Sequence, residues 1–365
     1  MKILVITSRY TANKDIIDED FGRQVRLFEN YCKFGNKVDF FCLDYIKFES
    51  KKKKLHKISV FIEPFKIYFP FSSYLRLDKL LKQKKYDALF VTSDPLWAFF
   101  GVHFSKKYNI PLIYDIQDNF KVYKSFKIPI VRYFHKLAVK NAKLVTCASK
   151  ILVKDQKKLR EKNIISIPNG VDLKLFKKLN IRKSRIKMEL PLNSKIISYI
   201  GSLQRKQGVD LLIKAFIKIK KDFSNLKLLI VGKLGKEEES DFDFSDKDII
   251  KIGSIKYNEV VYAINSSDVL ILPYPLNEFT RVMEAPYKIV EFMACDKPVV
   301  VTNVGDLPKL IENGSLVAKP GDISDLSDKI RNALNVKTNN RGKIKEYDWE
   351  VIAKKLDNYI KSAVN

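Results

Sequence analysis

The stretch VLILPYPLNEFTRVMEAPYKIVEFMACDKPVVVTNVGDLPKL, residues 269–310, decides the fold class, because it reads as strand, polar loop, short helix and strand. The apolar run at 269–272 ends at a proline, and Pro286 stands where the first turn of a helix favours proline. The β-branched run PVVVT at 298–302 is typical of a parallel strand covered on both faces. The stretch therefore predicts a parallel α/β unit.

The start of this helix predicts an anion site. A helix that begins at the carboxyl end of a parallel strand presents N–H groups and a partial positive charge, which suit a diphosphate. Lys288 and Glu291 lie three residues apart and share a face. We expect Glu291 to bind hydroxyls of an attached ribose or sugar. A solvated Lys–Glu pair on the helix surface is the alternative, and the spacing alone does not exclude it.

Length and composition limit the class of protein. The chain has 365 residues, 46% hydrophobic and 30% charged, which indicates a folded chain of about two domains. No run approaches the roughly 18 uninterrupted apolar residues of a membrane span. The N-terminal MKILVIT is interpreted as a first buried strand and not as a signal peptide, so we expect a cytoplasmic chain.

The net charge of +26, from 68 Lys plus Arg against 42 Asp plus Glu, favours an anionic partner. A nucleotide, a nucleic acid and an acidic membrane are all compatible with it, and so is a generally lysine-rich proteome. The four cysteines are scattered without a CxxC pair, and the three histidines lie outside any HExxH pattern. We therefore expect no metal site.

Strand-like and helix-like segments alternate along the chain, which predicts parallel doubly wound sheets. The alternation pauses in a basic polar stretch after IISIPNGVD at 164–172 and then restarts. We expect two α/β domains that face each other across a cleft, with a boundary near 170–190. The expected strands are KILVIT, KVDFFCL, DALFVT, PLIYDI and KLVTCAS, then KIISYIGS, LKLLIVG, DIIKIG, DVLILPY, KPVVVT and SLVAKPG.

Ligands of doubly wound sheets bind outside the carboxyl ends of the strands. In the first domain these ends carry Arg9, Tyr10, Ser93 and Asp94, followed by Gln117 and Asp118, and these residues are candidates for binding a ligand. In the second domain, GSLQRKQG at 201–208 follows a strand and precedes a helix, so its glycines permit close approach while its amides, with Arg205 and Lys206, meet phosphate.

Four motifs in order resemble the retaining family-4 glycosyltransferases, which have two facing Rossmann-like domains in the fold called GT-B. They are IPNGVD (167–172), GSLQRKQGVDLLIKAF (201–216), APYKIVEFMACDKPVVVT (285–302) and YDWEVIAKKL (347–356). The resemblance implies transfer of a sugar from a nucleoside diphosphate sugar to a hydroxyl acceptor, without a metal or other cofactor, in the assembly of a cell-surface polysaccharide, glycolipid or glycoprotein glycan.

The resemblance also implies domain limits and roles. The acceptor domain spans 1–170, and Arg9, Tyr10, Ser93 and Asp94 are its candidates for binding the acceptor. The donor domain spans 171–346, and a terminal helix at 347–365, with Trp349, returns to the first domain. Glu291 matches the glutamate that holds ribose, Lys288 with Arg205 serves the diphosphate, and Asp118 with Gln117 orients the acceptor or the transferring sugar. The donor-binding set is Gly201, Ser202, Arg205, Lys206, Gln207, Lys256, Tyr257, Tyr274, Glu284, Pro286, Tyr287, Lys288, Ile289 and Glu291.

The chain departs from the family pattern at several positions. A second glutamate usually lies eight positions before Glu291, where this chain has Met283, and Glu284 is the candidate substitute. Ser202 replaces a common arginine and Gln207 a common lysine. Gln117 replaces a common histidine and, unlike it, cannot act as a base. A helix cap or turn acid is the alternative interpretation of Asp118.

Residues 47–77 combine Lys51–Lys54 with many aromatics, which suits an anionic bilayer carrying a lipid-linked acceptor. An edge hairpin with core-facing aromatics and a solvated lysine turn is the alternative. A nicotinamide oxidoreductase is set aside, because no GxGxxG follows the first strand. Nucleic-acid binding lacks a recognised module. A catalytically idle nucleotide-sugar-binding protein of the same fold remains the alternative function.

Overall fold

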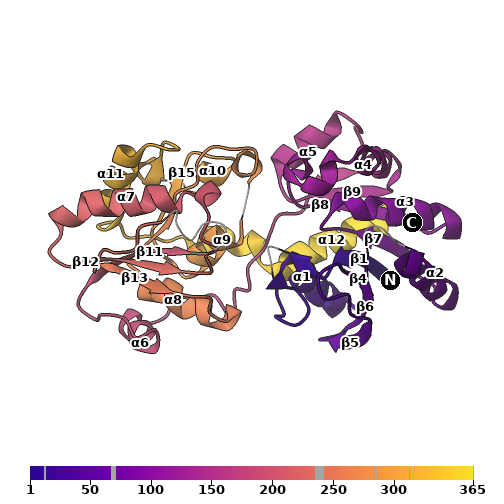
Figure 1. The fold of residues 1–365 in the computed structure, drawn as a ribbon, viewed down its shortest axis with the longest axis horizontal. Coiled ribbons are helices and arrows are strands. Elements are labelled where there is room, and N and C mark those ends of the chain that lie inside the picture. Colours follow the sequence, from indigo (N-terminus) through magenta and orange to yellow (C-terminus); the bar gives the residue numbers. More distant parts are fainter. Residues whose placement is uncertain (12–13, 67–70, 235–241, 284–285, 312, 365) are drawn as a thin grey trace. The chain divides into compact units, whose positions relative to one another are not determined.

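The computed structural model of the chain describes residues 1–11, 14–66, 71–234, 242–283, 286–311 and 313–364. The chain divides into two compact units (Figure 1). The N-terminal unit contains Met1–Asn169 and Trp349–Asn365, and the C-terminal unit contains Gly170–Asp348. The final helix thus belongs to the same unit as the first strand.

The N-terminal unit is built on an eight-stranded sheet in the order β10-β9-β8-β7-β1-β4-β6-β5. Seven strands are parallel, and only the edge strand β5 runs antiparallel, to β6. The central strands are buried along nearly their whole length, as their continuous apolar runs require. The strands are β1 (Lys2–Ser8), β4 (Lys37–Asp44), β5 (Lys51–Leu55), β6 (Ile58–Pro64), β7 (Ala88–Val91), β8 (Leu112–Ile116), β9 (Leu144–Cys147) and β10 (Ile164–Ser166), with a separate small pair β2 (Tyr10–Thr11) and β3 (Lys14–Asp15).

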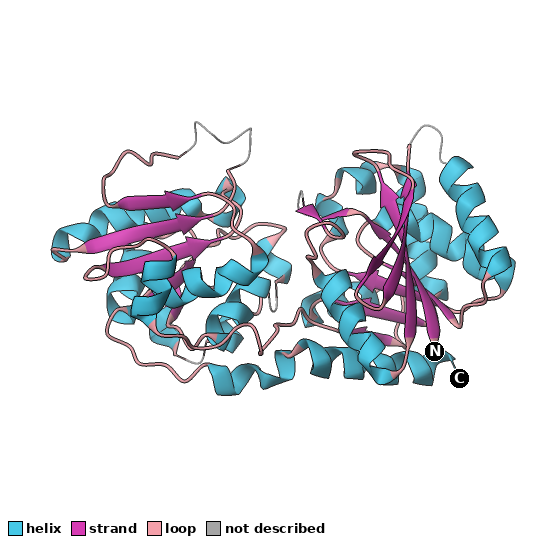
Figure 2. Ribbon diagram, turned by 90° about the horizontal axis from the view of Figure 1, so that it is seen from below, coloured by secondary structure: helices cyan, strands magenta, loops and turns pink. Residues whose placement is uncertain are grey.

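Helices cover both faces of this sheet (Figure 2). They are α1 (Arg23–Tyr31), α2 (Phe71–Gln83), α3 (Ala98–Tyr108), α4 (Pro129–Asn141), α5 (Lys150–Lys157) and the terminal α12 (Trp349–Val364). Helix α12 packs against α1, where Asn36 Nδ2 donates to Asp357 Oδ1 at 2.9 Å and Trp349 is buried.

The C-terminal unit has a six-stranded, entirely parallel sheet in the order β13-β12-β11-β14-β15-β16. Its strands are β11 (Lys195–Ile200), β12 (Leu226–Val231), β13 (Ile249–Ile252), β14 (Val269–Leu272), β15 (Val299–Thr302) and β16 (Val317–Ala318). Its helices are α6 (Ile181–Lys187), α7 (Val209–Ile219), α8 (Val260–Ser266), α9 (Tyr287–Ala294), α10 (Leu307–Leu310) and α11 (Ile323–Ala333). The order places the ends of β11 and β14 side by side at the centre of the sheet.

The predicted fold class, two doubly wound Rossmann-like parallel sheets, is confirmed. Within the stretch 47–77, strands β5 and β6 form the edge hairpin, but the predicted lysine turn is wrong. Lys51–Lys54 lie within strand β5, and the turn falls at His56 and Lys57. Lysines suit this strand because it is a sheet edge, where charged side chains remain solvated. Among the helices that the structure describes, none combines the length and the apolar character needed to cross a bilayer.

Candidate functional site

The loop after β11 is shaped by glycines that let three segments meet. Strand β11 ends at Ile200, and a short helical turn at Arg205–Gln207 leads through Gly208 into α7. Gly208 has φ +76°, and a Cβ there would lie 1.9 Å from the carbonyl oxygen of Pro273. Asn277 Nδ2 donates to the Lys206 carbonyl oxygen at 3.2 Å. The loop that follows β14 is thus held against the loop that follows β11.

Lys288, in the first turn of α9, extends its amine into the loop after β11. Its Nζ donates to Gln207 Oε1 at 2.6 Å and to the Tyr199 hydroxyl at 2.9 Å. The ammonium also lies over the rings of Tyr199 and Tyr274, 4.6 and 5.6 Å from their centroids. A Cβ at Gly201 would lie 2.3 Å from Lys288 Cε and Nζ. The absence of a side chain at Gly201 therefore leaves the space that the Lys288 side chain occupies.

Burial controls the protonation of this lysine. It lowers the pKa of Lys288 to about 7, and the neighbouring carboxylate of Glu291 opposes the shift. The partners of the amine are a neutral amide and a neutral phenol, whose own pKa burial raises well above its usual value. A phosphate brought to this place would therefore meet an ammonium whose nearest hydrogen-bond partners carry no negative charge.

Nine of the predicted donor residues form three groups. Gly201, Gln207, Tyr274 and Lys288 come together, as described. Pro286 is the N-cap of α9 with extended backbone, and Tyr287 is the first residue of the helix. Ser202, Arg205 and Lys206 are exposed in the loop after β11, where the Lys206 amine lies 5.6 Å from the centroid of the Phe279 ring.

The remaining donor candidates are less uniform. Glu291 is 5% exposed on the second turn of α9. Ile289 is fully buried in the core, and its amide donates to the Pro286 carbonyl at 3.1 Å, so its side chain faces away from a ligand. The exposed Lys256 is the N-cap of a short helix, and the Tyr257 ring packs edge-on against Phe176 at 5.4 Å. Glu284 lies outside the described residues.

Sequence reasoning missed Tyr199. It lies near the end of β11, is fully buried and joins Lys288 to Gln207. Its hydroxyl also lies 2.9 Å from the Ser202 carbonyl oxygen. The signal in the sequence was a single tyrosine within the apolar strand KIISYIGS, since a buried tyrosine hydroxyl usually requires a polar partner.

In the N-terminal unit, Arg9 forms ion pairs with carboxylates of the protein itself. Its guanidinium is fully buried and pairs with Asp15 and Asp44 at 2.8 Å, with Asp18 at 2.9 Å and with Glu49 at 2.6 Å. This arrangement favours a structural role over the predicted contact with an acceptor. Tyr10 packs edge-on against Tyr45 at 6.1 Å, and burial raises the pKa of Tyr10 to about 12.

Ser93 and Asp94 lie together at the end of β7. Ser93 has φ +78°, and its Oγ accepts from the Ser8 amide at 2.9 Å. Asp94 caps the short helix Pro95–Trp97 through the Leu96 amide at 2.8 Å and accepts from Ser125 Oγ at 3.0 Å. Burial raises the pKa of Asp94 above its ordinary value. A non-glycine residue held at positive φ marks a constrained strand end.

Gln117 and Asp118 follow β8, and each has internal partners. Gln117 Nε2 donates to Asp115 Oδ2 at 3.2 Å and also to Thr92 Oγ1, while its Oε1 accepts from Gln24 Nε2 at 3.2 Å. Asp118 Oδ2 accepts from the Tyr123 hydroxyl at 2.8 Å. The amide of Gln117 is thus fixed in orientation, and Asp118 fastens the segment that follows it.

Asp115 is a second residue that sequence reasoning missed. It is 1% exposed, accepts from Thr92 Oγ1 at 2.7 Å and from Thr146 Oγ1 at 2.6 Å, and pairs with Arg23 at 3.3 Å. Arg23 also donates to the carbonyl oxygens of Ile167 and Pro168 at 2.7 and 2.8 Å. The first residues of the IPNGVD motif are therefore held by this buried arginine.

Two parallel-sheet α/β units, one of them with a glycine loop and a lysine at adjoining strand ends, define the GT-B class. Solved structures of this fold match nearly all of the chain. Sucrose-phosphate synthase from Thermosynechococcus elongatus has a TM-score of 0.77 at 18% identity, over 99% of this chain and 98% of that chain. HepE from Anabaena, solved in complex with UDP, has a TM-score of 0.77 at 17% identity, over 99% and 100%.

The chain belongs to the family-4 glycosyltransferases. The family model described as glycosyl transferases group 1 matches residues 180–361, and the model described as glycosyltransferase family 4 matches residues 25–175. An uncharacterised glycosyltransferase of Methanocaldococcus jannaschii is 29% identical over 60% of this chain and 59% of its own length. A capsular polysaccharide biosynthesis glycosyltransferase of Staphylococcus aureus is 27% identical over 46% of this chain and 44% of its own. The chain thus spans about half the length of these curated relatives.

Proposed function

We propose that this protein is a retaining glycosyltransferase that moves a sugar from a nucleoside diphosphate sugar to a hydroxyl acceptor. The observation that carries the proposal is the amine of Lys288, which passes over Gly201 to the loop after β11. Within the part of the chain that the structure describes, it donates there to the neutral Gln207 amide and Tyr199 hydroxyl. This environment suits a diphosphate leaving group, because it supplies a positive charge whose hydrogen-bond partners are neutral.

The proposed chemistry asks the protein mainly for charge stabilisation and alignment. The bond between the anomeric carbon and the diphosphate oxygen breaks, and the acceptor oxygen bonds to the anomeric carbon on the same face of the sugar. The departing diphosphate oxygen takes the proton of the acceptor hydroxyl. Lys288, Arg205 and the amides at the start of α9 stabilise the charge that develops on the diphosphate. We propose that these groups act without a metal or other cofactor.

Glu291 is proposed to hold the ribose hydroxyls, one turn beyond the diphosphate. It is nearly buried on α9, so a hydroxyl that it accepts from would be shielded from water. The proposed nucleotide is uridine diphosphate. Support comes from the neighbouring HepE structures, which were solved with UDP and with UDP-glucose.

The acceptor is proposed to be a sugar or a lipid-linked sugar of a growing cell-surface glycan. The curated relatives include the capsular polysaccharide enzyme and a putative teichuronic acid biosynthesis glycosyltransferase of Bacillus subtilis. Asp118 and Asp94, at neighbouring strand ends of the N-terminal unit, are the proposed contacts for the acceptor. We propose a cytoplasmic protein that meets the inner face of the membrane peripherally.

A thermal-shift screen against nucleoside diphosphates and their sugars tests the proposal, because a ligand that binds only the folded state raises the unfolding temperature. We expect UDP and a UDP-sugar to shift the transition, and we expect the same sugar nucleotide to be slowly hydrolysed. Binding without hydrolysis or transfer would instead indicate a catalytically idle nucleotide-sugar-binding protein. The hydrogen bonds of Gln117 to residues of the protein favour this alternative. A screen in which no nucleotide shifts the transition would contradict both.

A further inference from the structure

The surface where the chain enters α4 exposes apolar side chains beside one another. A short helical turn at Lys124–Lys127 leads directly into the helix at Pro129. Ile130 and Tyr133 are 56% and 58% exposed, and Ile128 just before them is 38% exposed. Ile130 and Tyr133 lie three residues apart and share a helix face. Single exposed apolar residues are ordinary, but a contiguous group marks an interaction surface.

Positive charge surrounds these side chains. Lys124, Lys127 and Arg132 are exposed beside them. The 36 residues from Asn119 to Lys154 contain nine Lys or Arg and not one Asp or Glu. With 42 acidic residues in 365, a stretch of this length would ordinarily carry about four. The segment therefore carries more net positive charge than the composition of the whole chain predicts for its length.

The inner side of the same segment is firmly packed. The Phe126 ring lies edge-on to His135 at 5.2 Å, and Phe134 packs against Phe99 at 4.9 Å. Ser125 Oγ donates to Asp94 at 3.0 Å. The aromatic residues of the segment thus anchor it to the unit, and the isoleucines and Tyr133 are left on the outside, where the fold makes little use of them.

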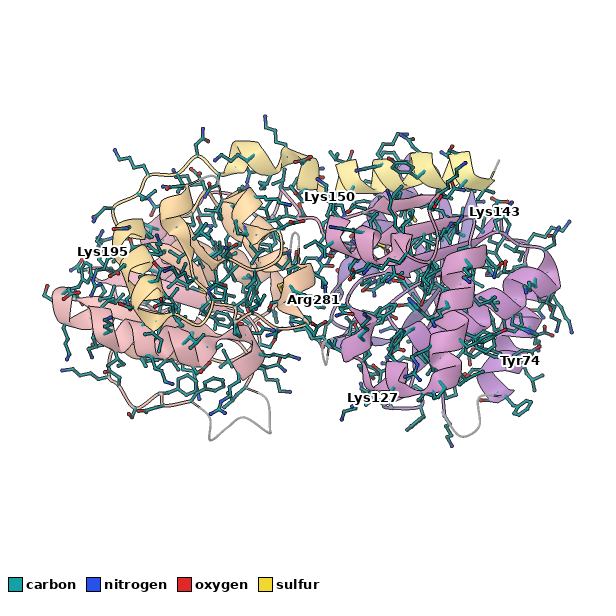
Figure 3. All side chains as sticks on the ribbon, turned by 90° about the horizontal axis from the view of Figure 1, so that it is seen from above. Tyr74, Lys127, Lys143, Lys150, Lys195 and Arg281 are labelled. Atoms are coloured by element: carbon teal, nitrogen blue, oxygen red, sulfur yellow. The ribbon has the colours of Figure 1, made fainter. Side chains whose placement is uncertain are left out.

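We propose that Lys124, Lys127, Ile128, Ile130 and Tyr133, called here the α4 patch, dock the protein on an anionic lipid surface. Aliphatic and aromatic side chains that enter the boundary between headgroups and acyl chains, with lysines that meet anionic headgroups, are the features of interfacial binding. A nucleic acid would satisfy the lysines but would leave the isoleucines in water. In Figure 3 the labelled Lys127 lies at the rim of the N-terminal unit.

The α4 patch is a better membrane surface than the lysines of β5. Lys51 pairs with Glu49 at 2.6 Å and Lys53 pairs with Asp18, so part of the β5 charge is neutralised internally. The two carboxylates that face the segment of the α4 patch, Asp94 and Asp118, are engaged by Ser125 and Tyr123. Because these carboxylates are the proposed acceptor contacts, docking would bring headgroups near the acceptor site. This closeness to the acceptor rests on the proposed function, whereas docking on the lipid surface does not.

Co-sedimentation with vesicles tests the proposal. The full-length protein is mixed at low salt with vesicles of phosphatidylcholine, with or without phosphatidylglycerol. We expect binding only to the anionic vesicles. Lys124→Gln/Lys127→Gln should lower partitioning about 25-fold, at about fivefold per lysine near such a surface. Ile128→Ser/Ile130→Ser should lower it at least tenfold without any change in charge.

The matched control is Lys52→Gln/Lys54→Gln on strand β5, which removes the same charge from another exposed lysine pair. It should retain binding within about threefold, since long-range charge alone is screened beyond roughly 10 Å. Equal losses in the control and in the α4 variants would overturn the proposal, as would wild-type protein that stays in the supernatant. Retention of such protein on heparin would then assign the charge to a polyanion.

Thermal shift with UDP, measured on the same variants, separates this proposal from the proposed function. The α4 variants should keep the nucleotide-induced shift of the wild type, because the donor residues belong to the other unit. Loss of vesicle binding with an intact shift supports docking. The opposite result is that vesicle binding depends on the α4 patch while no nucleotide changes the unfolding temperature. That result would support docking and contradict the proposed glycosyltransferase function.

Discussion

Lys288 places a positive charge beside position 207, where the chain has glutamine and its family commonly has lysine. The Gln207 amide oxygen accepts from the Lys288 amine at 2.6 Å. Lys288 on α9 thus supplies the charge that residue 207 lacks, in addition to the charges of Arg205 and Lys206 in the loop. This exchange could not be derived from the sequence, because residues 207 and 288 are 81 positions apart and only the sheet order brings them together.

Lys288→Ala should lower kcat/KM for sugar transfer by about 100-fold or more, the usual effect of removing one donor that stabilises developing negative charge. The unfolding temperature should change little, since burial disfavours this ammonium in the free protein. Steady-state kinetics and thermal unfolding measure the two effects. Lys214→Ala, an exposed lysine on α7, is the control and should match the wild type. Unchanged transfer by Lys288→Ala would remove the lysine from the site.

The affinity for UDP should fall as pH rises above about 7. Burial lowers the pKa of Lys288 to about 7 in the free protein, so the amine is largely neutral above that pH. A bound diphosphate favours the charged form and raises the pKa, so binding takes up a proton. The dissociation constant should increase by up to tenfold per pH unit between the two pKa values.

Calorimetry in buffers of different ionisation enthalpy measures this proton uptake directly. Lys288→Arg, which stays charged, should show an affinity that is nearly independent of pH between 7 and 9. Proton release on binding by the wild type, or a flat profile in the same range, would be inconsistent with the protonation state assigned to Lys288.

Gly201→Ala should weaken UDP binding by at least tenfold. The added Cβ would lie 2.3 Å from Lys288 Cε and Nζ, at a backbone φ of +151° that side chains rarely adopt. The lysine must therefore leave its present path. Gly253→Ala is the control, because a Cβ there meets nothing within 4 Å. Calorimetry should find the control unchanged, and equal affinities for both variants would mean that the path of Lys288 is unimportant.

At the scale of single elements, patterns of apolar residues predicted the strands except the small pair β2 and β3, the edge strand β10, and the hairpin of β5 and β6, which was only an alternative. The strand around 315–321 is reduced to Val317–Ala318, and the lysine run became the edge strand β5. Both differences lie at sheet edges, where one missing neighbour weakens the link between sequence pattern and pairing. The role of Asp115 was not predicted for a related reason. Its carboxylate lies within the apolar run PLIYDI, and its hydrogen-bond partners come from other strands.

One buried carboxylate contributes to the attachment of the terminal helix α12. Asp357 is fully buried and accepts from Asn36 Nδ2 at 2.9 Å and from Lys361 Nζ at 2.8 Å. Asp357→Ala should lower the free energy of unfolding by about 1–3 kcal/mol, because the buried Asn36 amide loses its partner. Urea unfolding measures this loss. Lys355→Ala, at an exposed position of the same helix, should change the free energy of unfolding by no more than about 0.5 kcal/mol. An equally small effect of Asp357→Ala would show that the Asn36–Asp357 hydrogen bond does not hold the helix.

At the scale of the whole molecule, the sequence predicted the fold class, and it predicted where the donor candidates lie in the fold better than it predicted the partners of the candidates in the N-terminal unit. The donor elements follow one another as a regular strand, glycine loop and helix, so local spacing already places Gly201 and Lys288 at strand ends. The acceptor candidates depend instead on networks that join distant strands. Arg9 was predicted to meet a ligand and is enclosed by carboxylates, because charge alone does not reveal which partner a side chain has.

The central claim is that a diphosphate binds in the C-terminal unit, between the loop after β11 and the start of α9. A crystal structure of the full chain soaked with UDP tests it most directly. We predict a diphosphate within hydrogen-bonding distance of Lys288 Nζ, beside Gly201, with the ribose toward Glu291. A diphosphate bound at any other place, with the Lys288 amine still donating to Gln207 and Tyr199, would contradict the account.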